Sequence, residues 1–199
     1  MAKIGLSKPI AAVYNFDDQT DMVAYSNNTV LGRYTEISID VENADDNVLY
    51  ADNGPAESDT SFAGGTVSMT TDDLSPANMV SVLGLPETAI SGTGAPEGAK
   101  WVEFDDRQNA PYIGLGGIIK RKVGGAIKYQ AFVLPKIKFQ NPSLAVTTQG
   151  ESIEWQTQKL TADISRDDTT NHRWQALSTY LDSEADAVKI IELFFGIGA

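Results

Sequence analysis

ISIDVEN (Ile37–Asn43), followed by LYADNGPAES (Leu49–Ser58), is the part of the sequence that decides the fold. In the first stretch, isoleucine and valine alternate with polar and acidic residues, which is the period of a strand with one buried and one solvated face. The second stretch contains Asp52-Asn53-Gly54-Pro55, four residues that favour a turn. The sequence therefore predicts a long strand that leads into a projecting acidic loop over residues 43–62.

Strand patterns also dominate the rest of the chain. Gly124-Gly125 separates two strand-like runs within residues 118–134 and predicts a hairpin with a two-residue turn, and Pro135 is expected to end its second strand. A change of phase near Gln158-Lys159 predicts a β-bulge. The other expected strands cover residues 9–16, 48–51, 66–71, 100–104, 111–119 and 151–165. We therefore expect a mainly β fold, an antiparallel β-sandwich or half-open barrel.

One or two short helices are expected beside the sheet. Ser75-Pro76 combines a preferred N-cap with proline at the first helical position, and Gly84 is a typical stop. A second helix is expected to begin near Ser183, because acids in its first turn suit the helix dipole, and to end at Gly196. A strand over residues 188–195 is the alternative interpretation of this last segment.

Length and composition fit one soluble domain. The chain has 199 residues, and 42% of them are hydrophobic, which is enough for a packed core. We expect a single domain over residues 1–199, with a flexible Gly- and Pro-rich loop over residues 85–98. The absence of cysteine excludes disulfides, thiolate metal sites and a cysteine nucleophile. Because the sequence contains neither a signal-peptide pattern nor a membrane-spanning apolar run, we expect synthesis in the cytoplasm and no membrane partner.

Charge is distributed in blocks. The formal net charge is −12. Residues 17–60 hold eleven acids and one base, whereas residues 111–142 hold six bases and no acid. Opposite poles favour one register of docking between copies of a chain. The acidic surface makes tight binding of duplex DNA unfavourable, because phosphates are repelled.

No residue set predicts catalysis. His172, the single histidine, lacks a serine-nucleophile motif in the sequence. Asp45-Asp46 and Asp167-Asp168 offer oxygen ligands without the spacing of a calcium loop. Gly114–Gly117 resembles half of a phosphate-binding loop, but glycines in a strand that another backbone approaches are the simpler interpretation. A carbohydrate platform is a further alternative, formed by Trp101, Trp155 and Trp174. We expect no enzyme activity, no cofactor and no metal.

Several segments, in order, resemble the major tail proteins that form the tail tube of long-tailed phages. The resemblance rests on ISIDVEN with LYADN and on Trp174 followed by a short acidic helix. It also rests on three longer segments: PYIGLGGIIKRK (111–122), YQAFVLPKIKFQNPS (129–143) and ESIEWQTQKLTADISR (151–166).

The resemblance implies a β-sandwich or half-open barrel with a flanking helix, the tail-tube fold. It implies that six subunits form a ring, that rings stack into a tube, and that genome DNA passes through the lumen without specific binding. The implied partners are further copies and other tail proteins (tape measure, terminator, baseplate or tip), and the implied location is the virion. A long loop between early strands, here residues 43–62, would reach the adjacent ring.

Two hypotheses place residues in this assembly. The outward acids Glu36, Asp40 and Glu42 are candidates for lining the lumen, or alternatively for an inter-ring contact. The candidate contacts between subunits are Asp45, Asp46, Leu49, Tyr50 and Asp52 in the loop, and Lys120, Arg121 and Lys122 at an expected hairpin tip. Three bases at such a tip also protect an edge strand from aggregation. The alternative function is a β-sandwich module that binds carbohydrate or calcium.

Overall fold

A computed structural model describes residues 2–43, 47–51, 54–59, 61–148 and 156–197. The described helices are α1 (Pro76–Leu83) and α2 (Glu184–Phe194). The described strands are β1 (Ala2–Asp17), β2 (Met22–Val30), β3 (Tyr34–Asn43), β4 (Asn47–Ala51), β5 (Gly54–Asp59), β6 (Phe62–Thr71), β7 (Glu87–Ala89), β8 (Lys100–Val102), β9 (Ile113–Val123), β10 (Ala126–Phe139), β11 (Gln158–Ser165) and β12 (Ala176–Leu177).

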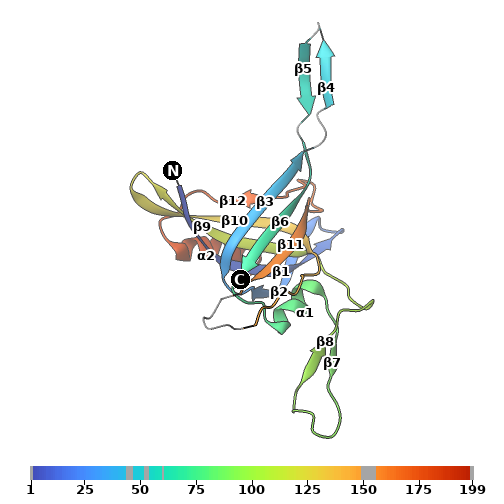
Figure 1. Cartoon of the computed structure of the whole chain (residues 1–199). Helices are drawn as coiled ribbons and strands as arrows, with labels where there is room; N and C mark the ends of the chain where they lie inside the picture. The colour runs from blue at the N-terminus through green and yellow to red at the C-terminus, as the bar shows by residue number, and fades with distance from the viewer. Residues whose placement is uncertain (1, 44–46, 52–53, 60, 149–155, 198–199) are drawn as a thin grey trace.

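Eight of these strands form one antiparallel sheet. Its hydrogen-bonded order is β2-β1-β9-β10-β11-β6-β3, and β12 pairs with β10. Figure 1 shows the sheet folded over, so that β3, β6 and β11 cross in front of β1, β9 and β10. The predicted mainly β class is confirmed: the sheet forms a half-open barrel with two short helices.

The main core lies between the two halves of the folded sheet. Val67 and Met69 of β6 point into it, as their alternation predicted, and both are almost fully buried. Facing residues from the other half include Ile113, Leu115 and Phe132. Apolar side chains from strands far apart in sequence therefore hold the barrel together.

Helix α2 covers the outer face of β9 and β10, where Ala187, Ile191 and Phe195 form a second buried cluster with strand residues. The helix interpretation of residues 188–195 is confirmed. A Cβ added to Gly116 would lie 2.7 Å from Ile191 Cγ2. The expectation that another backbone approaches Gly114–Gly117 is therefore wrong: side chains of the core and of the α2 region take up the space.

Helix α1 lies at one end of the barrel and has the predicted caps. The Ser75 Oγ accepts a hydrogen bond from Asn78 N at 3.2 Å, and Gly84 has a φ of 62°. A Cβ on Gly84 would lie 1.9 Å from the Asn109 carbonyl oxygen, so both the backbone conformation and the space require glycine. Val82 and Leu83 pack into the main core.

The predicted hairpin joins β9 and β10. Gly124 and Gly125 have φ values of 58° and 87°, as a two-residue turn with two positive φ angles requires. The prediction that Pro135 ends the strand is wrong. β10 continues to Phe139, and the register with β9 shifts between Leu134 and Ile137, which is where a sheet tolerates proline.

Several other predicted elements differ in their bounds. The strand expected over residues 100–104 is the shorter β8. β11 begins at Gln158 and pairs with β6 without a shift of register, so the β-bulge predicted near Gln158-Lys159 is absent from this ladder. Residues 151–155 lie outside the described residues. Within the segment 85–98, expected to be a loop, β7 forms a short ladder with β8.

Two arms extend from opposite ends of the barrel in Figure 1. β4 and β5 pair as an antiparallel hairpin within the predicted projecting segment. β7 and β8 form the other arm, beyond α1.

Candidate assembly surfaces

The predicted lumen acids Glu36, Asp40 and Glu42 are exposed on β3. The alternating residues Ile37 and Ile39 are half-buried and pack against the main core. β3 is an end strand of the sheet and pairs, among the described residues, with β6 alone. The acids therefore form a row on the outer face of an edge strand.

The predicted hairpin contacts are only partly described. Leu49 and Tyr50 lie in β4, opposite Glu57 and Pro55 of β5. Asp45, Asp46 and Asp52 lie outside the described residues. The hairpin stands clear of the barrel, joined to it through β3 and β6.

Lys120, Arg121 and Lys122 do not lie at an edge or at a hairpin tip, so that expectation is wrong. All three are in β9, which pairs with β1 on one side and β10 on the other. Because side chains alternate along a strand, Lys120 and Lys122 share one face and Arg121 occupies the other. The two faces therefore have to be considered separately.

Arg121 belongs to a row of three cations that the sequence reasoning missed. Lys3 of β1 and Lys128 of β10 are its register partners. Lys128 forms an ion pair with Asp182, and the Arg121 guanidinium lies 5.8 Å from the Tyr180 ring centroid. Sequence offers no signal for this row, because Lys3 and Arg121 are more than a hundred residues apart.

The cation row borders an open groove of about 260 Å³, which we call the mouth of the half-barrel. β3 forms one wall, and β1, β9, β10 and the β12 segment form the other. The lining residues are Lys3, Ile37, Ile39, Val41, Ile119, Arg121, Phe132, Gln175 and Leu177. The mouth thus combines apolar walls with two positive charges.

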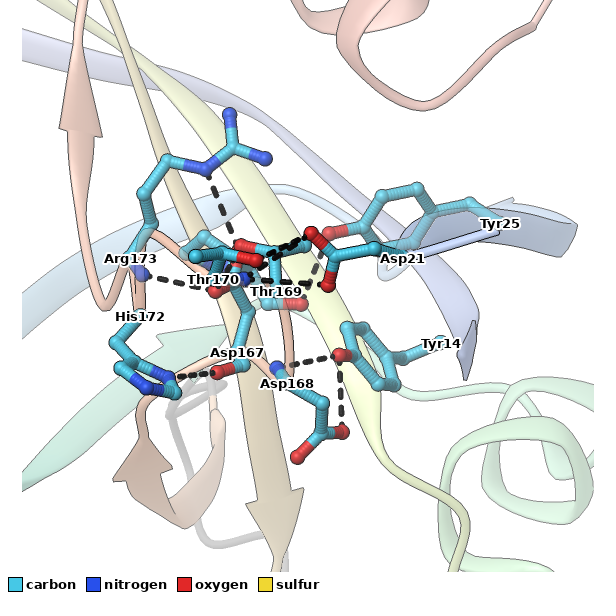
Figure 2. Close-up of polar contacts among 10 residues, drawn as sticks. Tyr14, Asp21, Tyr25, Asp167, Asp168, Thr169, Thr170, His172 and Arg173 are labelled. Atoms are coloured by element: carbon cyan, nitrogen blue, oxygen red, sulfur yellow. Dashed lines mark hydrogen bonds and ion pairs between the residues drawn. The ribbon is translucent and has the colours of Figure 1, made fainter. Parts of the chain in front are cut away.

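A polar loop after β11 holds the acid pair Asp167-Asp168 (Figure 2). The Asp167 side chain is only 1% exposed. Its Oδ1 accepts hydrogen bonds from Thr169 Oγ1 and Arg173 N, both at 2.8 Å, and its Oδ2 accepts one from Arg173 Nε at 3.3 Å. Thr170 in turn donates to Asp21 in the β1–β2 turn. The bonds of Asp167 therefore hold the loop in its conformation, and the bonds from Thr170 to Asp21 tie the loop to the β1–β2 turn.

Asp168 forms the second part of this network with Lys136 and Tyr14. Lys136 Nζ lies 2.7 Å from Asp168 Oδ2, and Tyr14 Oη donates to the same oxygen at 3.0 Å. Burial by itself would raise the pKa of Asp168, but the hydrogen bonds from Lys136 and Tyr14 outweigh it, so the pKa lies below its ordinary value. Burial, with Asp168 nearby, raises the pKa of Tyr14 to about 12.

Asp168→Asn should remove a stabilising contribution that depends on pH. A depressed folded-state pKa stabilises the protein above the unfolded value of about 4, and this contribution is lost as the pH falls through the folded pKa. Because Asp168 is 41% exposed, we expect the loss near neutral pH to be only roughly 0.5–1 kcal/mol. Urea unfolding of wild type and variant at several pH values measures it. Exposed Asp106→Asn is the control, and a difference that persists at acidic pH would contradict this role.

The alternative sites do not assemble among the described residues. His172 Nδ1 lies 3.3 Å from the Asp167 carbonyl oxygen. Trp174 stacks on Phe62 with centroids 4.6 Å apart, whereas Trp101 is exposed on the β7–β8 arm; Trp155 lies outside the described part. In that part, no group of three or more His, Asp or Glu side chains could hold a metal ion, and no helix is long and apolar enough to cross a membrane.

No protein-family model matches the chain, and no curated protein matches its sequence.

Proposed function

We propose that the chain is the structural subunit of a phage tail tube, in which six copies form a ring and stacked rings enclose a channel for DNA. The open sheet carries the proposal. β2 and β3 are its end strands, and each has one neighbour among the described strands. Unpaired strand edges favour pairing with another chain, and a closed ring of sheets removes such edges.

The exposed acids of β3 support the proposal that this strand lines the channel. Glu36, Asp40 and Glu42 are exposed on the face that points away from the core. A negative wall repels DNA phosphates and lets a duplex slide without binding. This function requires no catalytic group and no cofactor, and its partners are further copies and the other proteins of the tail.

Negative-stain electron microscopy of the purified chain tests the proposal. Raising protein concentration and salt should produce rings or tubes, because salt screens repulsion between acidic copies. A chain that stays monomeric throughout the series and responds instead to a carbohydrate or to calcium would refute it.

A pair of matched variants tests whether copies of the chain pair through the edge of β2. Met22 at the start of β2 is 64% exposed, and Leu193 on α2 is 73% exposed. Met22→Lys should reduce assembly, since lysine on an edge strand opposes edge pairing, whereas Leu193→Lys should assemble as wild type does. Equal assembly by both variants would argue against edge pairing through β2.

A further inference from the structure

Two strand edges border the mouth of the half-barrel. β3 pairs with β6 on one side only, and the register of β1 with β2 begins at Ile10. In the described part of the chain, residues 2–8 of β1 therefore pair with β9 alone. Because the edge formed by residues 2–8 of β1 exposes backbone donors and acceptors, an added extended segment can pair there without using the edge of β3.

The mouth also carries two positive charges, Lys3 and Arg121, that form no ion pair with a carboxylate of the described residues. Arg121 Nε is buried and has no hydrogen-bond partner among the described residues. Lys3 lies directly opposite Arg121 in the register and lines the same groove. A buried donor without an acceptor is costly, and a carboxylate is the strongest acceptor for a guanidinium. The segment that fits the mouth is therefore extended, partly apolar and acidic.

The β4–β5 hairpin of another copy has this chemistry. Residues 43–62 contain five acids and no base, and they include the apolar run Val48-Leu49-Tyr50. The hairpin is already extended, and it projects from the barrel instead of packing on it. Its charge is opposite to that of the mouth, which favours this register of docking over others.

We propose that the mouth of the half-barrel is the receptor for the β4–β5 hairpin of a second copy. The inference rests on the proposed assembly function and deepens it by assigning the acceptor site. Every copy carries one donor and one receptor on different surfaces, so the contact is of the kind that propagates into rings or filaments. Of the three predicted basic contacts, only Arg121 faces the receptor.

Cysteine cross-linking between two variants tests the proposal on the full chain. The natural sequence has no cysteine, so Leu49→Cys in one variant and Leu177→Cys in the other introduce the only thiols. Leu177 lines the mouth and is 54% exposed. Mixing the two variants under mild oxidation should yield the mixed disulfide dimer. Leu49→Cys mixed with Leu193→Cys, an exposed leucine on α2, is the matched control and should yield little.

Charge reversal separates specific docking from random collision. Lys3→Glu in the receptor variant should lower the initial cross-linking rate by about tenfold, the effect of losing one favourable charge pair. Lys189→Glu, the same change on the exposed face of α2, should leave the rate unchanged. Circular dichroism checks that each variant is folded, and Ser58→Cys replaces Leu49→Cys if the latter is not.

The outcomes distinguish this inference from the proposed function. If the wild-type chain forms tubes but no cross-link to position 177 forms, the assignment of the receptor is wrong and the proposed tube function stands. If the specific cross-link forms but the chain forms no rings or tubes, the receptor is supported and the proposed tube function is wrong. Equal rates with Lys3→Glu and Lys189→Glu would also overturn the receptor, because its charge would then contribute nothing.

Discussion

Replacing Gly117 by valine is expected to destabilise the fold severely. A Cβ at this position would lie 2.6 Å from two ring atoms of Phe132 and 2.9 Å from Tyr34 Cε2. Both rings are buried in the main core, so neither moves without displacing its neighbours. Overpacking of this kind costs about 3 kcal/mol, and thermal unfolding should shift down by on the order of 10 °C.

Gly64→Val provides the control for this prediction. Gly64 also lies in a strand, β6, but an added Cβ there meets nothing within 4 Å. Its melting temperature, measured by circular dichroism, should stay close to that of wild type. If Gly117→Val had the same melting temperature as Gly64→Val, the close packing of Phe132 and Tyr34 against β9 would be wrong.

If β3 lines the channel of the proposed tube, replacing its acids by lysine should make the tube retain DNA. The triple variant Glu36→Lys, Asp40→Lys, Glu42→Lys changes the charge of each subunit by six, and ring symmetry repeats the change around the channel. Lysines that contact phosphates release counterions, so the affinity gained should fall by on the order of 10³-fold between about 50 and 200 mM salt. Co-sedimentation of tubes with DNA measures both the binding and its salt dependence.

A variant with the same change of charge elsewhere is needed for comparison. Asp18, Glu97 and Asp106 are exposed and belong to other parts of the chain, and their replacement by lysine should retain far less DNA. Comparable retention by both triple variants would mean that net charge alone binds DNA, and the assignment of the β3 acids to the channel would fail.

Local patterns predicted several elements correctly but missed β2, where no strand was expected. The N-cap Ser75, the stop Gly84 and the Gly124-Gly125 turn all have the conformations expected, because each depends on neighbours within a few residues. Alternation placed Val67 and Met69 in the core for the same reason. Pro135 misled the reasoning, since a strand paired through a register shift accommodates a residue that cannot donate to the ladder.

The candidate surfaces depended on pairings that no local pattern encodes. The basic residues of β9 were expected at an edge, and the register with β1 shows that they are central. The same long-range pairing brings Lys3 beside Arg121 and creates the cation row. The Asp167 network likewise joins a loop after β11 to the β1–β2 turn, so its structural role became visible only in three dimensions.

The order in which the strands meet has a consequence for how the protein is made. The first seven residues of β1 pair only with β9 in the described structure, which leaves the ribosome about a hundred residues later, and α2 follows after all the strands. Closing so distant a ladder is entropically slow. Apolar faces of the incomplete sheet therefore stay exposed to solvent during most of synthesis. Aggregation is most favourable in this interval, and binding by a chaperone would then have its largest effect.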